Sequence, residues 1–226
     1  MSTITSKSDA EIADLIRVEK LFAILRGVKR DQIVETARAL SRGGVKFLEV
    51  TFNHDAPHGI EETLECLKRI RVALSEKICL GAGTVLTAEQ VRFAADVGAQ
   101  FIVSPNVDQN VIRATKDLAM VSLPGALTPT EILQAHNAGA DMVKLFPGGS
   151  FGPDYVKAMG GPLKGIPLIV VGGVDLDNIL QFFAAGAVGV GLGSNLVNSR
   201  EANAGNFAGI EEKARAFVEK IQASTT

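Results

Sequence analysis

The chain has 226 residues, 46% of them hydrophobic, so it can bury one large core, and α/β barrels commonly form a single domain of about 200–250 residues. Its 23 lysines and arginines against 25 aspartates and glutamates leave a net charge of -2, which gives no reason to expect a nucleic acid or an anionic membrane as a partner. With two cysteines, no apolar signal-peptide core at the start and no segment of membrane-spanning length, we expect a soluble cytoplasmic protein without a disulfide framework.

Short apolar segments alternate with amphipathic segments along the whole chain. Ile12, Leu15 and Ile16 predict a helix over residues 6–18, ahead of the first strand. The strands expected after it are residues 21–25, 47–51, 78–82, 101–104, 120–123, 139–147, 168–171 and 188–191. The helices expected between and after them are residues 31–40, 57–74, 87–97, 108–117, 128–138, 154–159, 175–185 and 207–222.

The order of these elements predicts the fold class. Capping boxes at Thr87 with Gln90 and at Thr128 with Glu131 mark two of the helix starts. Eight strands alternating with helices predict a parallel sheet, and the number eight favours a closed (β/α)₈ TIM barrel over an open doubly wound sheet. We therefore expect one domain over residues 1–226, with an N-terminal helix in residues 1–20 and the barrel in residues 21–226.

Four of the expected strands follow the same glycine-initiated pattern. Aligned on their glycines, the four segments place Glu49, Val103, Lys144 and Gly191 at one equivalent position. In a (β/α)₈ barrel, alternate strands contribute side chains to common interior layers, and chemistry occurs at the carboxyl ends of the strands. We therefore expect these four residues to form one layer in which Glu49 and Lys144 converge near the barrel axis. A buried Glu49–Lys144 ion pair is the purely structural alternative, although such pairs seldom stabilise more than an apolar core does.

An amine and a carboxylate in one apolar layer indicate a type of catalysis. Burial disfavours the charged form of an amine, and the uncharged form is a nucleophile. Lys144 can condense with a ketone to form a Schiff base while Glu49 moves protons. The same pair also allows a sugar-phosphate isomerase or epimerase, with Glu49 as base and no imine. A protein that binds a phosphorylated ligand without reaction is a third possibility.

Glycine-rich segments follow the last two expected strands. In such barrels, the loops at this position commonly bind phosphate through backbone N–H groups and a helix N-terminus. The segments contain Gly172 and Gly173 after one strand, and Gly193 and Ser194 after the next. Arg26, at the end of the first strand, can bind a carboxylate or phosphate in a bidentate manner.

Other polar residues give weaker signals. Thr84 offers a hydroxyl at the end of the third strand. His54 and His58 are four residues apart, but Pro57 predicts a loop there and no further ligand is evident, so we expect no metal site.

With these residues placed, the chain from about Leu21 to Gln222 resembles the KDPG/KHG aldolase family. The resemblance rests on Ala23-Ile24-Leu25-Arg26-Gly27, Gly44-Val45-Lys46-Phe47-Leu48-Glu49-Val50-Thr51, Gly81-Ala82-Gly83-Thr84-Val85, Ser104-Pro105, Val143-Lys144-Leu145-Phe146-Pro147, Gly172-Gly173-Val174 and Gly193-Ser194. It implies a (β/α)₈ barrel that assembles as a homotrimer and needs no metal or other cofactor. It further implies that Lys144 forms the Schiff base and that Glu49 is the acid/base. The implied substrate contacts are Thr84, Pro105 and Phe146 on the pyruvate side, and Gly172, Gly173 and Ser194 at the phosphate.

The resemblance also implies a substrate. The expected reaction is reversible cleavage of 2-keto-3-deoxy-6-phosphogluconate to pyruvate and D-glyceraldehyde 3-phosphate. Phe52-Asn53 and Val171 depart from the gluconate-type pattern, which has Leu-Arg and Thr at these positions, and are more similar to the galactonate-specific branch. The alternative substrates are therefore 2-keto-3-deoxy-6-phosphogalactonate and 4-hydroxy-2-oxoglutarate.

Overall fold

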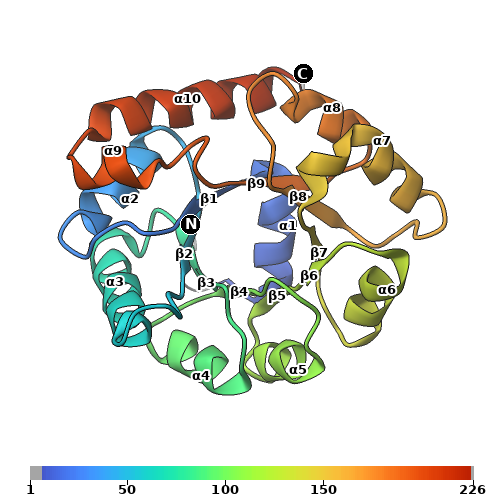
Figure 1. The fold of residues 1–226 in the computed structure, drawn as a ribbon, viewed down its shortest axis with the longest axis horizontal. Coiled ribbons are helices and arrows are strands. Elements are labelled where there is room, and N and C mark those ends of the chain that lie inside the picture. Colours follow the sequence, from blue (N-terminus) through green and yellow to red (C-terminus); the bar gives the residue numbers. More distant parts are fainter. Residues whose placement is uncertain (1–6, 225–226) are drawn as a thin grey trace.

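The computed structural model describes residues 7–224, which form a ring of parallel strands surrounded by helices (Figure 1). The strands are β1 (Leu21–Leu25), β2 (Phe47–Thr51), β3 (Cys79–Gly83), β4 (Phe101–Val103), β5 (Val121–Leu123), β6 (Gly125–Ala126), β7 (Val143–Leu145), β8 (Leu168–Val171) and β9 (Gly189–Leu192). The helices are α1 (Asp9–Glu19), α2 (Ile33–Arg42), α3 (Gly59–Leu74), α4 (Ala88–Asp96), α5 (Gln109–Asp117), α6 (Pro129–Asn137), α7 (Gly148–Gly160), α8 (Ile179–Ala184), α9 (Ser199–Asn203) and α10 (Phe207–Ala223). No helix within the described residues is long and apolar enough to span a membrane.

The strand order confirms the expected barrel with a helix before β1. The sheet runs β5-β4-β3-β2-β1-β9-β8-β7-β6 with parallel pairing throughout. Its two edge strands, β5 and β6, are consecutive in the chain and are separated only by Pro124. The ring is therefore nearly closed, and the expected fifth strand continues past Pro124 instead of ending before it.

Pro124 explains why one expected strand is observed as two. Proline has no N–H to give to a sheet ladder. On one side of it β5 pairs with β4, and on the other β6 pairs with β7. The carbonyl of Pro124 still accepts a hydrogen bond of 2.9 Å from the Lys144 N–H. We call the Pro124–Gly125 segment, where the two edges of the sheet meet, the seam.

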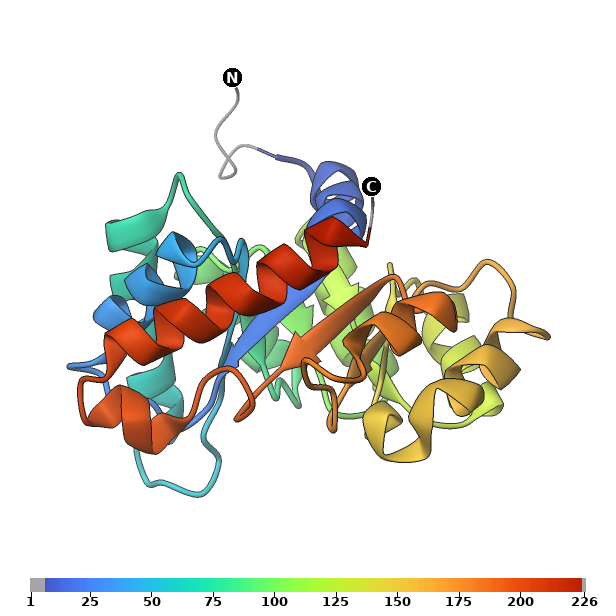
Figure 2. The same ribbon diagram turned by 90° about the horizontal axis from the view of Figure 1, so that it is seen from above.

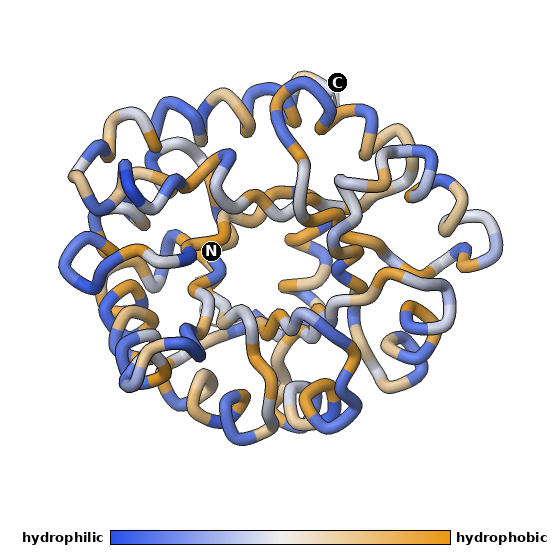
Figure 3. The backbone as a smooth tube through the Cα atoms, viewed as in Figure 1, coloured by the Kyte–Doolittle hydropathy of each residue, from blue (hydrophilic) through white to orange (hydrophobic). Residues whose placement is uncertain are grey.

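The barrel interior is apolar and is closed at one end by α1. Hydrophobic residues concentrate on the strands, and polar residues on the outer faces of the helices (Figure 3). Phe22, Phe47 and Phe101 pack together inside, with ring centroids 5.1–6.0 Å apart. Ile12 and Ile16 of α1 belong to the same interior cluster. Figure 2 shows α1 at the end of the barrel opposite to the strand arrowheads, so the carboxyl ends of the strands stay open.

Several element boundaries differ from the sequence-based expectation. Helix α7 begins at Gly148, inside the expected loop, and is kinked at Gly152, where φ is 78°. Helix α8 begins at Ile179, and the Asp175 side chain ahead of it accepts hydrogen bonds from the N–H groups of Asp177 and Asn178, as a helix-capping residue does. Helix α9 was not expected from the sequence. Its five residues are too few for a periodic pattern.

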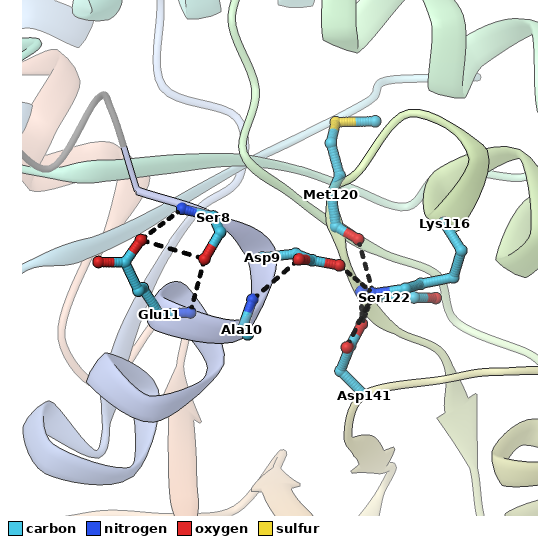
Figure 4. A network of polar contacts seen from close by, with 8 residues as sticks. All are labelled: Ser8, Asp9, Ala10, Glu11, Lys116, Met120, Ser122 and Asp141. Atoms are coloured by element: carbon cyan, nitrogen blue, oxygen red, sulfur yellow. Dashed lines mark hydrogen bonds and ion pairs between the residues drawn. The ribbon is translucent and has the colours of Figure 1, made fainter.

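A polar network fastens α1 to the barrel (Figure 4). Lys116 Nζ, at the end of α5, lies 2.9 Å from Asp9 Oδ2 in α1 and 2.7 Å from Asp141 Oδ2 ahead of β7. It also donates to the Met120 carbonyl, and Asp141 accepts from the Ser122 N–H. One half-buried ammonium thus joins α1, α5 and the starts of two strands. Its hydrogen bond holds the pKa of the Asp9 carboxyl below the usual value.

Replacing Lys116 with Met should lower the free energy of unfolding by about 2 kcal/mol, because two carboxylates lose a partially buried partner. For a chain of this size the melting temperature should fall by about 4–8 °C. Since the Asp9 pKa is lowered in the folded state, the stabilisation is present above the aspartate pKa of the unfolded chain, about 3.9, and is lost as the pH falls through the folded-state value. The deficit, measured by calorimetry, should therefore narrow as the pH drops from about 5 to about 3. Lys157→Met, at an exposed position of α7, is the control, and equal effects at pH 7 would contradict the prediction.

Candidate active site

A cavity of about 830 Å³ opens at the carboxyl ends of the strands, and we call it the cleft. Nine of the ten site residues predicted from the sequence line it. Five lie at the ends of β1, β3, β4 and β7: Arg26, Thr84, Pro105, Lys144 and Phe146. The other four lie in the loops after β8 and β9: Gly172, Gly173, Gly193 and Ser194. The structure thus brings these nine together at one end of the barrel.

The tenth residue, Glu49, lies below the cleft in a smaller cavity of about 10 Å³, which we call the inner cavity. This is about the space that one water molecule requires. All four residues of the predicted layer line the inner cavity: Glu49, Val103, Lys144 and Gly191. The layer predicted from the glycine alignment is therefore found. Since Lys144 also lines the cleft, its side chain stands at the boundary between the two spaces.

Lys144 lies on β7, where the short strand fixes its backbone between β6 and β8. The residue is 8% exposed. Its Nζ lies 5.1 Å from the centroid of the Phe146 ring, close enough for a cation–π contact. Phe146 itself is 42% exposed. The amine is thus held in largely apolar surroundings but can be reached from the cleft.

Glu49 lies on β2, is 3% exposed, and carries a buried Oε1 that has no hydrogen-bond partner among the described residues. Lys144 lies near enough to act through its charge. However, the part of the chain that the structure describes contains no ion pair between the two, so the structural alternative does not account for them. Burial raises the pKa of the Glu49 carboxyl, and the positive charges of Lys144 and Arg26 oppose that rise. A buried carboxyl with a raised pKa and a free oxygen is suited to accept and donate protons.

Gly83 makes the space that the Glu49 carboxyl occupies. A Cβ atom built on Gly83 would overlap Glu49 Oε1 and would lie 2.5 Å from Glu49 Cδ. Any side chain at residue 83 would therefore displace the carboxyl. In the sequence, Gly83 stands out only as part of a motif, because a contact between two strands cannot be inferred from one of them.

Thr84, the next residue, has an unusual backbone conformation at the rim of the cleft. Its φ of 55° lies in the left-handed region, which a β-branched residue rarely adopts. Arg26 Nη2 donates to the Thr84 hydroxyl over 3.1 Å, and His54 Nε2 donates to the Thr84 carbonyl over 2.8 Å. His54 thus has a hydrogen-bonding role in the structure. No group of three or more His, Cys, Asp or Glu side chains that could hold a metal ion occurs within residues 7–224.

The glycine loop after β8 packs closely against the N-terminal end of α7. Gly172 and Gly173 have φ values of 86° and 85°, which favour glycine. A Cβ on Gly149 would overlap the Gly172 carbonyl oxygen. Asn178 Nδ2 donates to the Gly173 carbonyl, and Asn195 Nδ2 to the Val174 carbonyl, over 2.9 and 2.7 Å. These contacts fix the backbone of the loop on one wall of the cleft.

All the charged side chains that line the cleft within the described residues are cationic. The charged residues that line it within the described structure are Arg26, Lys144 and Arg200. Arg200 was not expected from the sequence; it lies on α9, two residues after the capping residue Asn198. Its position shortly after the last strand was the available signal, because segments at that point reach the mouth of a barrel. An acidic ligand would meet three positive charges here.

Comparison with known proteins identifies the family. The model of the family "KDPG and KHG aldolase" matches residues 12–213. The 2-dehydro-3-deoxy-6-phosphogalactonate aldolase of Escherichia coli K12 is 38% identical over 177 residues, which cover 78% of this chain and 83% of that protein. A probable 2-dehydro-3-deoxy-6-phosphogalactonate aldolase of Rhizobium meliloti is 40% identical over 178 residues, covering 78% and 81%.

More distant relatives and a solved structure agree with this assignment. A 2-dehydro-3-deoxy-phosphogluconate aldolase of Haemophilus influenzae is 28% identical and covers 96% of this chain and 100% of its own. The solved structure described as "Native KDPGal structure" has a TM-score of 0.82 at 35% identity, over 91% of this chain and 95% of its own. The fold, the arrangement of the cleft and these matches show that the chain belongs to the KDPG and KHG aldolase family and is an aldolase, a lyase.

Proposed function

We propose that the protein is a Schiff-base aldolase that cleaves 2-keto-3-deoxy-6-phosphogalactonate to pyruvate and D-glyceraldehyde 3-phosphate. The observation that carries the proposal is the placement of Lys144. Its amine stands at the boundary between the cleft and the inner cavity that holds Glu49, whose Oε1 has no hydrogen-bond partner among residues 7–224. A ketone bound in the cleft would meet a nucleophile and a proton carrier from the same side.

The reaction begins when Lys144 attacks the C2 ketone and Glu49 transfers protons as the carbinolamine loses water. The resulting iminium accepts the electron pair of the C3–C4 bond as that bond breaks, which leaves an enamine. Glu49, directly or through water, takes the proton of the C4 hydroxyl, so that C4 becomes the aldehyde carbon of glyceraldehyde 3-phosphate. Protonation of the enamine at C3 and addition of water at C2 then release pyruvate and restore the amine.

The raised pKa of Glu49 supports this double role. A carboxyl at its ordinary pKa is almost fully ionised near pH 7 and is a poor acid there. Burial raises the pKa of Glu49 towards the operating pH, where a group exchanges protons most effectively in both directions. Lys144 and Arg26 limit that rise, so the carboxyl retains a usable basic form.

The charge of the cleft matches that of the substrate. A phosphorylated keto acid carries one negative charge on its carboxylate and about -1.5 to -2 on its phosphate near pH 7. We assign the phosphate to the backbone at Gly172, Gly173, Gly193 and Ser194, with Arg200 nearby on the same rim. Arg26, bonded to the Thr84 hydroxyl after β3, is then placed for the carboxylate, with Pro105 and Phe146 beside the pyruvate part.

Two observations favour the galactonate over the gluconate. Of the relatives described above, those named for phosphogalactonate are 38% and 40% identical, whereas the Haemophilus enzyme named for phosphogluconate is 28% identical. Val171 lines both the cleft and the inner cavity. Its side chain cannot hydrogen-bond a sugar hydroxyl, whereas the threonine of the gluconate-type pattern can. The proposal therefore moves from the gluconate expected first to the galactonate alternative.

Incubation with pyruvate and borohydride should attach a reduced pyruvate adduct to the wild-type protein and none to Lys144→Ala, because only an imine is trapped in this way. The measurement is intact-protein mass, followed by mapping of the modified peptide. Lys157→Ala, on the surface of α7, is the matched control and should be labelled like the wild type. An unlabelled, folded wild type would refute the imine and would favour a proton-transfer enzyme in which Glu49 is the base and Lys144 acts only through its charge.

The wild type should cleave the galactonate epimer with a kcat/KM at least about tenfold above that of the gluconate epimer, since apolar Val171 offers no partner to a misplaced hydroxyl. Release of pyruvate from each epimer at the same enzyme concentration gives the ratio. A ratio below one would return the assignment to the gluconate.

Gly83→Ala should lower kcat by on the order of 10²-fold, since the new Cβ displaces the Glu49 carboxyl and positioned acid/base catalysis contributes about 10²–10⁴-fold. Gly160→Ala is the control, because a Cβ there meets nothing within 4 Å. Circular dichroism would verify that both variants fold. Equal rates for the two folded variants would show that the reaction does not need the space that Gly83 leaves for the Glu49 carboxyl.

A further inference from the structure

We infer that His54 is a positioning residue that holds Thr84 in its left-handed conformation, and thereby places Arg26 and the Glu49 carboxyl for the reaction. The inference rests on the proposed function. His54 lines neither the cleft nor the inner cavity, so it acts through Thr84 and not on the substrate itself. The sequence motifs described above assign it no role.

The Thr84 backbone conformation needs support. Its φ of 55° is unfavourable for a β-branched residue and persists only where the surroundings enforce it. Both neighbours are fixed by sheet-like bonds: the Gly83 carbonyl accepts from the Phe52 N–H over 2.8 Å, and the Val85 N–H donates to the Val103 carbonyl over 3.1 Å. Between these two anchors, the Thr84 carbonyl is held by His54 alone among the hydrogen bonds of the described residues.

In the bond between His54 and Thr84, the histidine is the donor. A carbonyl oxygen only accepts, so the Nε2 atom of His54, 2.8 Å away, carries the hydrogen. Both the neutral Nε2–H tautomer and the protonated ring can donate from this atom. The contact therefore persists whichever protonation state His54 adopts. This distinguishes a positioning role from a proton-transfer role.

Thr84 is connected to both Arg26 and the Glu49 carboxyl. Thr84 accepts a hydrogen bond from Arg26 through its hydroxyl, and it directly follows Gly83, on which the Glu49 carboxyl rests. A change in the Thr84 backbone would therefore displace both the Arg26 contact and the space beside Gly83 that the Glu49 carboxyl occupies. His54 belongs to the loop between β2 and α3, five residues after Glu49, and its ring lies 6.3 Å from that of the buried Phe52. The strand that carries Glu49 thus leads into the loop whose His54 holds Thr84, next to Gly83 and the Glu49 carboxyl.

The test uses His54→Phe, which keeps an aromatic ring beside Phe52 but has no donor. We expect kcat/KM for the phosphorylated keto acid to fall about tenfold, with a higher KM because the Arg26 contact is disturbed and a lower kcat because the Glu49 carboxyl is displaced. The reduction should be similar at pH 6 and pH 8, since both forms of the histidine donate. His54→Gln restores a donor and should recover part of the loss. His58→Phe is the matched control, because His58 makes no capping bond at the start of α3 and should leave the kinetics unchanged.

A double-mutant cycle tests whether His54 acts through Thr84. Glycine adopts a φ of 55° without strain, so Thr84→Gly removes both the need for support and the hydroxyl that meets Arg26. In the Thr84→Gly background, His54→Phe should then lower kcat/KM by less than about twofold. Additive losses would overturn the inference, as would His54→Phe kinetics equal to those of His58→Phe.

A second measurement does not depend on activity. The protein has three histidines, so the ¹⁵N resonances of the wild type can be assigned by comparison with His54→Gln and His58→Phe. A directly bonded proton on Nε2 of His54 supports the inference, and the Nδ1–H tautomer overturns it. Failure of the borohydride experiment on the wild type would instead refute the imine chemistry, so the two failures are distinguishable.

Discussion

The site depends on one constraint: a carboxyl group is buried in the apolar interior of a barrel, and one of its oxygens has no hydrogen-bond partner in the part of the chain that the structure describes. Burial of an unpaired ionisable group is costly, and the fold lowers that cost only in part through the positive charges of Lys144 and Arg26. The neighbouring residues are arranged around this group. Gly83 has no side chain, so the carboxyl fits, and Val103 and Gly191 complete an inner cavity too small for more than about one water molecule.

The two ends of the barrel have different roles. At the amino ends of the strands, α1 contributes Ile12 and Ile16 to the interior cluster and is fastened by Lys116. That end is closed and stabilises the fold. At the carboxyl ends, loops and strand ends line a broad cleft with cations. The separation allows unpartnered and strained groups, such as Glu49 and the Thr84 backbone, to persist on a scaffold secured elsewhere.

Most of the fold and most of the cleft residues could be predicted because they follow from local patterns, whereas Pro105 and Phe146 were expected only from the resemblance to the aldolase family. Apolar strands separated by amphipathic helices indicate the barrel, and equal spacing from a glycine placed Glu49 and Lys144 in one layer. What the sequence could not supply depends on contacts between distant segments. The split at Pro124 needs both neighbouring strands, and α9 is too short for a periodic signal. The left-handed turn at Thr84 requires His54, which is thirty residues earlier and resembles a surface loop histidine.

The seam at Pro124–Gly125 has a mechanical consequence for Lys144. Two residue pairs join β6 to β7, as many as join β3 to β4, whereas five join β2 to β3. Lys144 bonds to the seam through its N–H, and a side chain on Gly125 would overlap the Pro105 carbonyl oxygen. The segment that closes the ring thus touches the strand of Lys144 on one side and the Pro105 wall of the cleft on the other, so a displacement of the seam would shift both together.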